Sequence, residues 1–152
     1  ERSLAALLEA DAAPYGWLGA SLASVMPAHV VYPQVDTLPA GFSRRWIQDI
    51  LRRQLGFTGA IFSDDLTMEG ARVAGSVTDC AQAALDAGCD FILVCNNPRA
   101  ADEVLNHVKW RSTPEFAQRC ARLVPMGVAP TMVQLAAEGR YQAALADVRA
   151  LP

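Results

Sequence analysis

The chain has 152 residues, of which 52% are hydrophobic, and its formal net charge is −3. This length suits one domain, residues 1–152, with a single hydrophobic core. This negative net charge does not favour nucleic-acid binding, which typically uses a surface rich in Lys and Arg. No apolar run approaches the roughly 18 residues of a membrane span.

The predicted elements alternate between helices and strands along the chain. Apolar residues at helical spacing predict the helices, and Ser43, Ser76 and Thr113 or Ser112 are suitable caps for three of them. The helical ranges are 2–10, 14–20, 44–55, 68–75, 79–87, 99–110, 114–123 and 131–150, with a break in the last at Gly139. Continuous apolar runs predict buried strands over 22–31, 60–64 and 91–95. Strands separated by helices indicate βαβ units and a parallel sheet.

Three strands are too few to close a barrel, which needs about 250 residues in eight strand–helix units. A three-stranded parallel sheet on its own leaves its edge strands unpaired. The predicted fold is therefore α/β, the C-terminal part of a TIM-like barrel, with about three parallel strands, flanking helices and additional C-terminal helices. The open sheet edges also predict self-association.

Four cysteines, Cys80, Cys89, Cys95 and Cys120, form no C-x-x-C pair and have no histidine at zinc-finger spacing. Free cysteines behave as small hydrophobic residues, and Cys89 and Cys95 lie in or beside a very apolar segment, so we expect buried thiols. This pattern favours a reducing, cytoplasmic compartment. We expect no metal and no organic cofactor.

The segment Gly59–Ala71, GAIFSDDLTMEGA, is the strongest candidate for chemistry. An apolar strand ends here in two carboxylates, and ionised groups are not left in apolar surroundings without partners. Polar residues at the C-terminal ends of barrel strands build active sites, although both aspartates can instead cap the next turn. Strand alternation puts Asp64 on the face of Phe62 and Asp65 on the face of Ser63. Only one of the two can therefore point at the barrel axis.

Three blocks carry a resemblance to a known family: VMPAHVVY (25–32), LRRQLGFTGAIFSDDLTMEGA (51–71) and LDAGCDFILVCNN (85–97). They resemble the family 3 glycoside hydrolases, and within them the bacterial cytoplasmic β-N-acetylhexosaminidases of peptidoglycan recycling. The resemblance implies a TIM-like barrel. It also implies a retaining glycosidase that removes a terminal N-acetylglucosamine from anhydro-muropeptides.

The resemblance assigns the nucleophile to Asp64. Retaining hydrolysis uses a carboxylate that attacks the anomeric carbon, and in the family this is the aspartate directly after Ser or Thr at the end of the seventh strand. Asp65 is then assigned to anchoring the loop that follows. A different barrel enzyme, such as a lyase that uses Asp64 as a base, is an alternative.

The chain departs from the family in one large respect. The KHFPGHG-like segment, which supplies sugar-binding Lys and His and an Asp–His acid/base dyad, does not occur, and the two histidines present are His29 and His107. The chain thus holds the nucleophile without the complete site. Alone, it is expected to be inactive, as a fragment or as an assembly module.

Three residues, His29, Met68 and Asn96, are weaker candidates for contact with the carbohydrate substrate, and Glu69 is weighed as a second carboxylate. His29 follows the first strand, either as a pocket residue or hydrogen-bonded to a neighbouring loop. Met68 and Asn96 lie after the other two strands, where Met commonly serves packing and Asn serves turns. Glu69 offers a second carboxylate or sits solvated at a helix start.

Overall fold

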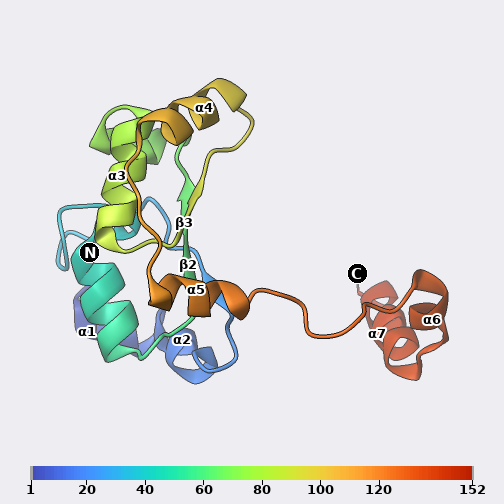
Figure 1. The fold of residues 1–152 in the computed structure, drawn as a ribbon. Coiled ribbons are helices and arrows are strands. Elements are labelled where there is room, and N and C mark those ends of the chain that lie inside the picture. The colour runs from blue at the N-terminus through green and yellow to red at the C-terminus, as the bar shows by residue number, and fades with distance from the viewer. Residues whose placement is uncertain (1, 152) are drawn as a thin grey trace.

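Three parallel strands form the centre of the computed structural model, which describes residues 2–151 (Figure 1). They are β1 (Ser24–Val25), β2 (Ala60–Asp65) and β3 (Phe91–Leu93), in the order β1-β2-β3. Both pairings are parallel, and the register of β2 against β3 shifts within β2. Helices connect the strands, so the predicted α/β class with a parallel sheet is confirmed.

The outer strands are shorter than predicted. β1 ends at Val25 instead of 31, because Pro27 follows and has no N–H to donate to a ladder. β3 ends at Leu93 instead of 95, and its three side chains are only half-buried. The expectation of a strand covered on both faces is therefore wrong for β3.

The helices follow the predicted pattern with shifted ends. Their bounds are α1 (Leu4–Glu9), α2 (Ala13–Leu18), the 3₁₀ helix η1 (Ala40–Phe42), the π-helix η2 (Arg45–Gln54), the 3₁₀ helix η3 (Glu69–Ala74), α3 (Val77–Ala87), α4 (Pro98–His107), α5 (Pro114–Ala121), α6 (Met132–Ala137) and α7 (Gly139–Arg149). The last predicted helix is broken one residue before the predicted position, at Glu138, and Gly139 is the first residue of α7.

Local sequence explains where α3 begins and ends. The Ser76 side chain accepts a hydrogen bond from the Asp79 amide, and the Asp79 side chain accepts one from the Ser76 amide. This reciprocal capping box satisfies amide donors that a helix start leaves free. Gly88 ends the helix with φ 116°, and a Cβ there would lie 1.8 Å from the Gln48 side chain. Only glycine therefore lets α3 end so close to η2.

The main core lies between the sheet and the helices η2 and α3. It contains Val25, Phe42, Ile47, Phe57, Ile61, Leu66, Ala71, Cys80, Ala81, Ala84, Ala87 and Cys89. All four cysteines are free; Cys80 and Cys89 are buried as predicted, whereas Cys95 is exposed. Burial raises the pKa of the Cys89 thiol to about 12, so it stays protonated and unreactive at neutral pH.

A buried ion cluster lies at the N-terminal end of β3. The Asp90 carboxylate accepts hydrogen bonds from Arg52 at 3.0 Å, from Arg119 Nε at 2.9 Å and from the Ile61 amide at 2.9 Å. Its side chain is only 4% exposed. The three partners come from η2, α5 and β2, so this one carboxylate ties three elements together. In barrels, this end of the strands serves stability.

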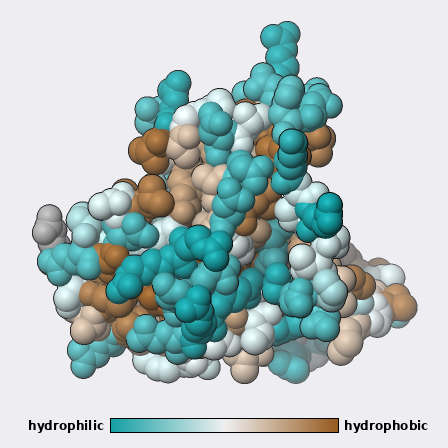
Figure 2. Space-filling model, turned by 60° about the vertical axis from the view of Figure 1, so that its left-hand side comes forward, coloured by the Kyte–Doolittle hydropathy of each residue, from teal (hydrophilic) through white to brown (hydrophobic). Residues whose placement is uncertain are grey.

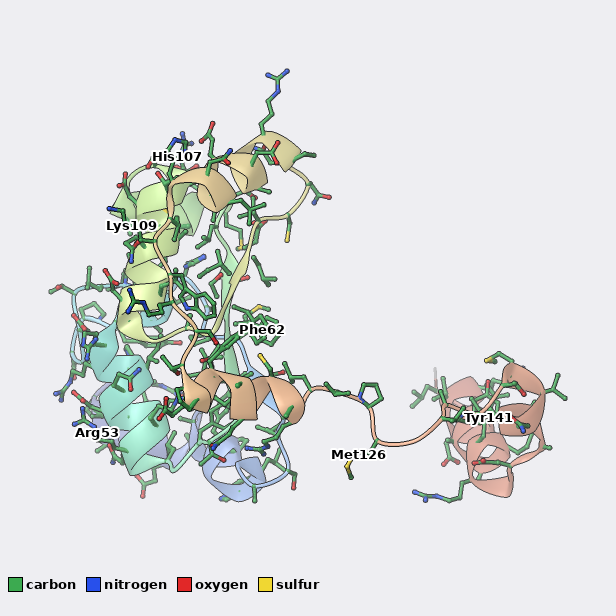
Figure 3. All side chains as sticks on the ribbon, in the orientation of Figure 1. Arg53, Phe62, His107, Lys109, Met126 and Tyr141 are labelled. Carbon is green, nitrogen blue, oxygen red and sulfur yellow. The ribbon has the colours of Figure 1, made fainter. Side chains whose placement is uncertain are left out.

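The α6–α7 hairpin lies apart from the body of the molecule (Figure 1). An extended segment, residues 122–130, leads to it from α5, and the Met126 side chain projects from that segment (Figure 3). The two helices pack against each other, with Tyr141 partly buried in the hairpin (Figure 3). Among residues 2–151, no helix is long and apolar enough to cross a membrane.

Candidate active site

Asp64 and Asp65 are the last two residues of the central strand β2. Because all three strands are parallel, the loops that follow them leave from the same edge of the sheet. This edge is the one that carries active sites in parallel α/β folds. The sequence prediction that Asp64 ends a parallel strand is confirmed.

The buried residues of β2 lie on the side of the helices, whereas its last two residues, Asp64 and Asp65, are both half-buried. Ile61 and Ser63 are fully buried on the side of η2 and α3, and the Ser63 hydroxyl accepts a hydrogen bond from the Leu93 amide at 3.0 Å. Phe62 points to the other face, where its ring stacks on Phe91 at a centroid distance of 4.5 Å. Counting by two from Phe62 assigns Asp64, which is half-buried, to the face away from η2 and α3; the register shift against β3 lies between Phe62 and Asp65. Figure 3 shows Phe62 beside the sheet on this face.

Asp65 makes the contacts expected of an anchor. Its carboxylate accepts hydrogen bonds from the Thr67 amide at 3.0 Å, the Thr67 hydroxyl at 2.7 Å and the Cys95 amide at 3.0 Å. Desolvation acts to raise the pKa of Asp65, but the hydrogen bonds from Thr67 and Cys95 outweigh it and hold the pKa below its ordinary value. Asp65 thus joins the exits of β2 and β3. By contrast, Asp64 accepts a local hydrogen bond on Oδ1, from the adjacent Asp65 amide at 2.9 Å.

His29 lies in the segment after β1 and packs against the segment after β2. Both ring nitrogens are buried, and no described residue hydrogen-bonds to them. The ring centroid lies 4.9 Å from that of Phe42, and a Cβ on Gly70 would lie 3.0 Å from the His29 carbonyl oxygen. The alternative of a histidine hydrogen-bonded to a neighbouring loop is therefore wrong. A Gly70 without a side chain lets η3 approach His29 closely.

The remaining candidates are exposed. Glu69 is in the first turn of η3, where its Oε2 lies 3.0 Å from Arg72 Nη1, and its side chain is 86% exposed. Glu69 therefore matches the alternative of a solvated glutamate at the start of a helix. Met68 precedes η3 and is 45% exposed. Asn96 follows β3 with φ 56°, and it is the sole non-glycine residue with positive φ in the described chain.

The two histidines lie in different parts of the structure. His29 lies near η1 and η3, whereas His107 is at the end of α4, exposed, with Nδ1 2.9 Å from the Glu103 carbonyl oxygen (Figure 3). Among residues 2–151, no three His, Cys, Asp or Glu side chains are grouped to hold a metal ion.

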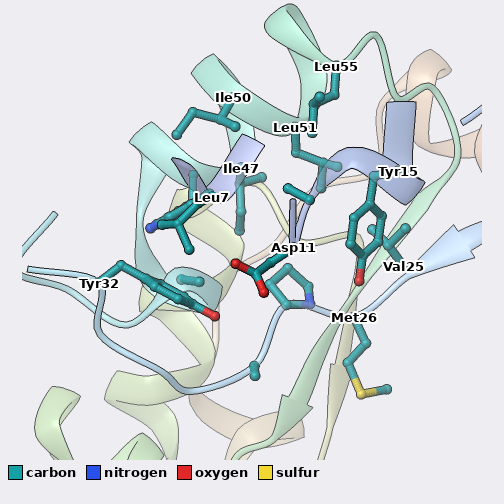
Figure 4. A pocket seen from close by; sticks show the side chains of 15 residues that line it. Leu7, Asp11, Tyr15, Val25, Met26, Tyr32, Ile47, Ile50, Leu51 and Leu55 are labelled. Atoms are coloured by element: carbon teal, nitrogen blue, oxygen red, sulfur yellow. The ribbon is translucent and has the colours of Figure 1, made fainter. Parts of the chain in front are cut away.

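The main apolar cavity, about 270 Å³, is not at the aspartates. It lies between α1, η2 and the segment after β1, and Figure 4 shows Asp11, Tyr15 and Tyr32 as its polar side chains among aliphatic ones. A second pocket of about 510 Å³ adjoins Thr67 on the side of α3 and α4. Neither pocket includes Asp64. Asp64 itself is half-buried.

Two features were missed by the sequence analysis. The Asp90 cluster joins residues far apart in the chain, and a lone Asp before an apolar strand gives no signal of its partners. The left-handed Asn96 did have a signal, since Asn-Asn-Pro after a strand is typical of a turn and Asn is enriched at positive φ.

Comparisons with known proteins agree on one family. Residues 1–125 match the profile described as "Glycosyl hydrolase family 3 N terminal domain". A protein named Beta-hexosaminidase from Bordetella avium is 58% identical over 142 residues, which cover 93% of this chain and 40% of the relative. Another of that name, from Thiobacillus denitrificans, is 50% identical over 152 residues, covering 99% of this chain and 42% of the relative.

Comparison with solved structures indicates the same family. The crystal structure of NagZ from Neisseria gonorrhoeae in complex with N-trifluoroacetyl-D-glucosamine matches with a TM-score of 0.84 and 45% sequence identity. The match covers 97% of this chain and 43% of that chain. The present chain thus spans about two fifths of the length of the curated relatives that it matches.

Proposed function

Because the chain belongs to glycosyl hydrolase family 3, we propose that it forms one wall of the active site of a retaining β-N-acetylglucosaminidase, with Asp64 as the nucleophile. One observation carries the proposal: Asp64 lies at the C-terminal end of the central parallel strand, where alternation from Phe62 assigns it to the face away from η2 and α3. Asp65, by contrast, is committed to hydrogen bonds with the loops. The names of the relatives, and the glucosamine derivative bound to the gonococcal protein, support this substrate class.

The proposed reaction has two steps. In the first, an Asp64 carboxylate oxygen forms a bond to the anomeric carbon, while the bond from that carbon to the glycosidic oxygen breaks. The leaving oxygen takes a proton from a general acid. In the second step, the same group removes a proton from water, whose oxygen bonds to the anomeric carbon and releases Asp64. Two displacements restore the original configuration of the sugar.

The general acid is the part of the site that these residues do not supply. In the family that the chain resembles, an Asp–His dyad on the KHFPGHG-like segment has this role, and the present sequence does not contain that segment. His29 has both ring nitrogens buried, and His107 is at the end of α4. We therefore place the acid/base in a part of the enzyme outside this sequence.

We propose anhydro-muropeptides of the cytoplasm as the substrate, with cell-wall recycling as the process. The support is the sequence resemblance of the three blocks around β1, β2 and β3 to enzymes of that pathway. The reaction requires no metal and no organic cofactor, because two protein groups supply the nucleophile and the proton.

A hybrid enzyme tests the proposal. The part of the Bordetella avium relative outside the matched segment is joined to this chain, and hydrolysis of a chromogenic N-acetylglucosaminide is measured. Asp64→Asn keeps the shape but cannot attack carbon, so we expect kcat to fall on the order of 10³-fold or more. The matched control is Asp102→Asn, which changes an exposed carboxylate on α4.

A trapped intermediate gives the second readout. A 2-fluoro N-acetylglucosamine analogue should leave the hybrid with a covalent adduct on the peptide that contains Asp64, detected by mass spectrometry. An unlabelled Asp64 in an active hybrid would contradict the nucleophile role. Loss of activity in Asp64→Asn without any adduct would instead favour a base, as in a lyase.

A further inference from the structure

The exit of β3 is held beside the exit of β2 by hydrogen bonds. The Leu66 amide donates to the Leu93 carbonyl oxygen at 2.9 Å, which continues the β2–β3 pairing past the end of β2. One step further along β3, the Cys95 amide donates to Asp65 Oδ1 at 3.0 Å. The residue after this second bond is Asn96. Its position is therefore fixed relative to the strand end that carries Asp64.

Asn96 has an unusual conformation for a residue with a side chain. Its φ of 56° lies in the left-handed region, which non-glycine residues seldom occupy and in which Asn is enriched. Such residues persist where their surroundings hold them, and they cluster at ligand sites. The side chain is exposed, while the amide group offers both a hydrogen-bond donor and an acceptor. A sugar presents hydroxyl and acetamido groups that need both.

We propose that Asn96 contacts the sugar substrate next to Asp64 and that Asp65 is the residue that positions it. The proposal rests on the proposed function and adds a second wall to that site. Asp65 acts through the Cys95 amide, because this bond fixes the turn in which Asn96 lies. The two neighbouring aspartates thus divide the work: Asp64 reacts, and Asp65 holds the residue that orients the sugar.

A glycine substitution separates the side chain of Asn96 from its backbone. Glycine adopts positive φ without steric cost, so Asn96→Gly keeps the turn and removes only the amide. In the hybrid enzyme described above, we expect this variant to keep the melting temperature of the parent. Its affinity for N-acetylglucosamine, measured by titration, should fall by about tenfold, as the loss of one hydrogen bond to a ligand allows. Asn96→Ala should lose affinity and stability together.

A double-substitution cycle tests the role of Asp65. If Asp65 acts only by positioning Asn96, Asp65→Asn weakens sugar binding in the parent but has no further effect on binding in Asn96→Gly. Faster hydrogen exchange of the Cys95 amide in Asp65→Asn is the accompanying structural readout. Asp102→Asn serves again as the control with an exposed carboxylate.

Each outcome decides between the hypotheses. Parent-like sugar affinity in Asn96→Gly would overturn the contact, and additive losses in the double variant would overturn positioning by Asp65. A hybrid that binds the sugar but does not hydrolyse it would refute the proposed function and leave the Asn96 test intact. A folded hybrid that does not bind N-acetylglucosamine would refute both.

Discussion

Two neighbouring aspartates differ in their hydrogen-bond partners. Asp64 and Asp65 share a sequence environment, and strand alternation assigns them to opposite faces of β2. Asp65 has three hydrogen-bond donors from two loops, which stabilise its charged form. Asp64 has one donor, the amide of its neighbour. The carboxylate with fewer partners is the one that we propose as the nucleophile.

At the residue scale, we predict that acid weakens the fold through three carboxylates. The Ser43 hydroxyl lowers the pKa of Asp36, the Ser76 hydroxyl lowers that of Asp79, and the loop hydrogen bonds lower that of Asp65 despite desolvation. The unfolded chain binds protons more readily at these groups. Their stabilisation is therefore complete well above pH 3.8, the ordinary value, and is lost as the pH falls from there through the lowered folded values.

Urea unfolding followed by tryptophan fluorescence at a series of pH values measures this loss. Asp65→Asn should be less stable than the parent at neutral pH and should lose less stability on acidification. Asp102→Asn, which has no such hydrogen bonds among the described contacts, should keep the parent's slope. An acid slope unchanged in Asp65→Asn would show that its hydrogen bonds do not control the titration.

At the scale of elements, the Asp90 cluster is the contact that holds α5 against the sheet. Arg119 of α5 donates to Asp90 from Nε and also lies 2.7 Å from it through Nη2. Phe116 of the same helix packs against Phe91 with ring centroids 5.4 Å apart. A charged contact and an aromatic contact together fix α5 near the N-terminal ends of β2 and β3.

We expect the loss in the free energy of unfolding to be larger when a substitution leaves a more deeply buried charge without its partner. Asp90→Ala leaves Arg52 and Arg119 without their shared partner in a site where Asp90 is 4% exposed, so we expect a loss of about 3–5 kcal/mol in the free energy of unfolding. Arg119→Ala should cost less, about 1–3 kcal/mol, because Arg52 still neutralises Asp90.

The matched control for this ranking is Arg53→Ala. Arg53 pairs with Asp49 across one turn of η2, and both side chains are largely exposed (Figure 3). Such surface pairs contribute about 0–1 kcal/mol. Denaturant unfolding of the variants measures the differences. Equal losses in Arg119→Ala and Arg53→Ala would show that the cluster does not hold α5.

The elements also show what the sequence could predict. Ser76, Gly88 and Gly139 act locally, so α3 and, to within one residue, the break before α7 were predicted correctly. The ends of β1 and β3 were not, since apolar composition continues past both: β1 stops shortly before Pro27, and β3 stops at Leu93, opposite the last residue of β2. A strand ends where its hydrogen-bond partners end, and that depends on tertiary pairing.

The candidate site likewise has features that the sequence predicts and features that it does not. Asp64, its strand and its face followed from the periodicity of β2 and from the resemblance of its motif. The Asp65–Cys95 bond spans 30 positions in the sequence, and the left-handed Asn96 follows it directly. Likewise, the unpaired nitrogens of His29 result from packing against Phe42 and Gly70, which no local pattern reveals.

At the scale of the whole molecule, apolar surface and unpaired sheet edges are prominent. Trp17 is 78% exposed, Leu105 is 81% exposed and Val133 is 82% exposed. Figure 2 shows hydrophobic side chains between hydrophilic ones on one face of the molecule. In the described sheet, β1 and β3 each pair on one side only. Surfaces of this kind promote association.

We therefore predict that the chain by itself self-associates and has little or no hexosaminidase activity. General acid–base catalysis contributes typically ~10²–10⁴-fold, and the residues described here leave Asp64 without a matched acid. Light scattering gives the size, and a chromogenic N-acetylglucosaminide gives the rate beside the hybrid enzyme. Comparable turnover by a monodisperse monomer would place the acid within these residues, with Glu69 the first to test.

The Asp90 cluster also has a consequence for the order of events during translation. Arg52 and Asp90 leave the ribosome before Arg119 does, so the nascent chain carries this carboxylate for a time with only part of its final neutralisation. The ion pair between Arg119 and Asp90, which joins α5 to the sheet, can form only once α5 has emerged from the ribosome. Arrested nascent chains that end shortly before and well after Arg119 should therefore differ in protease resistance, although both contain the complete set of strands.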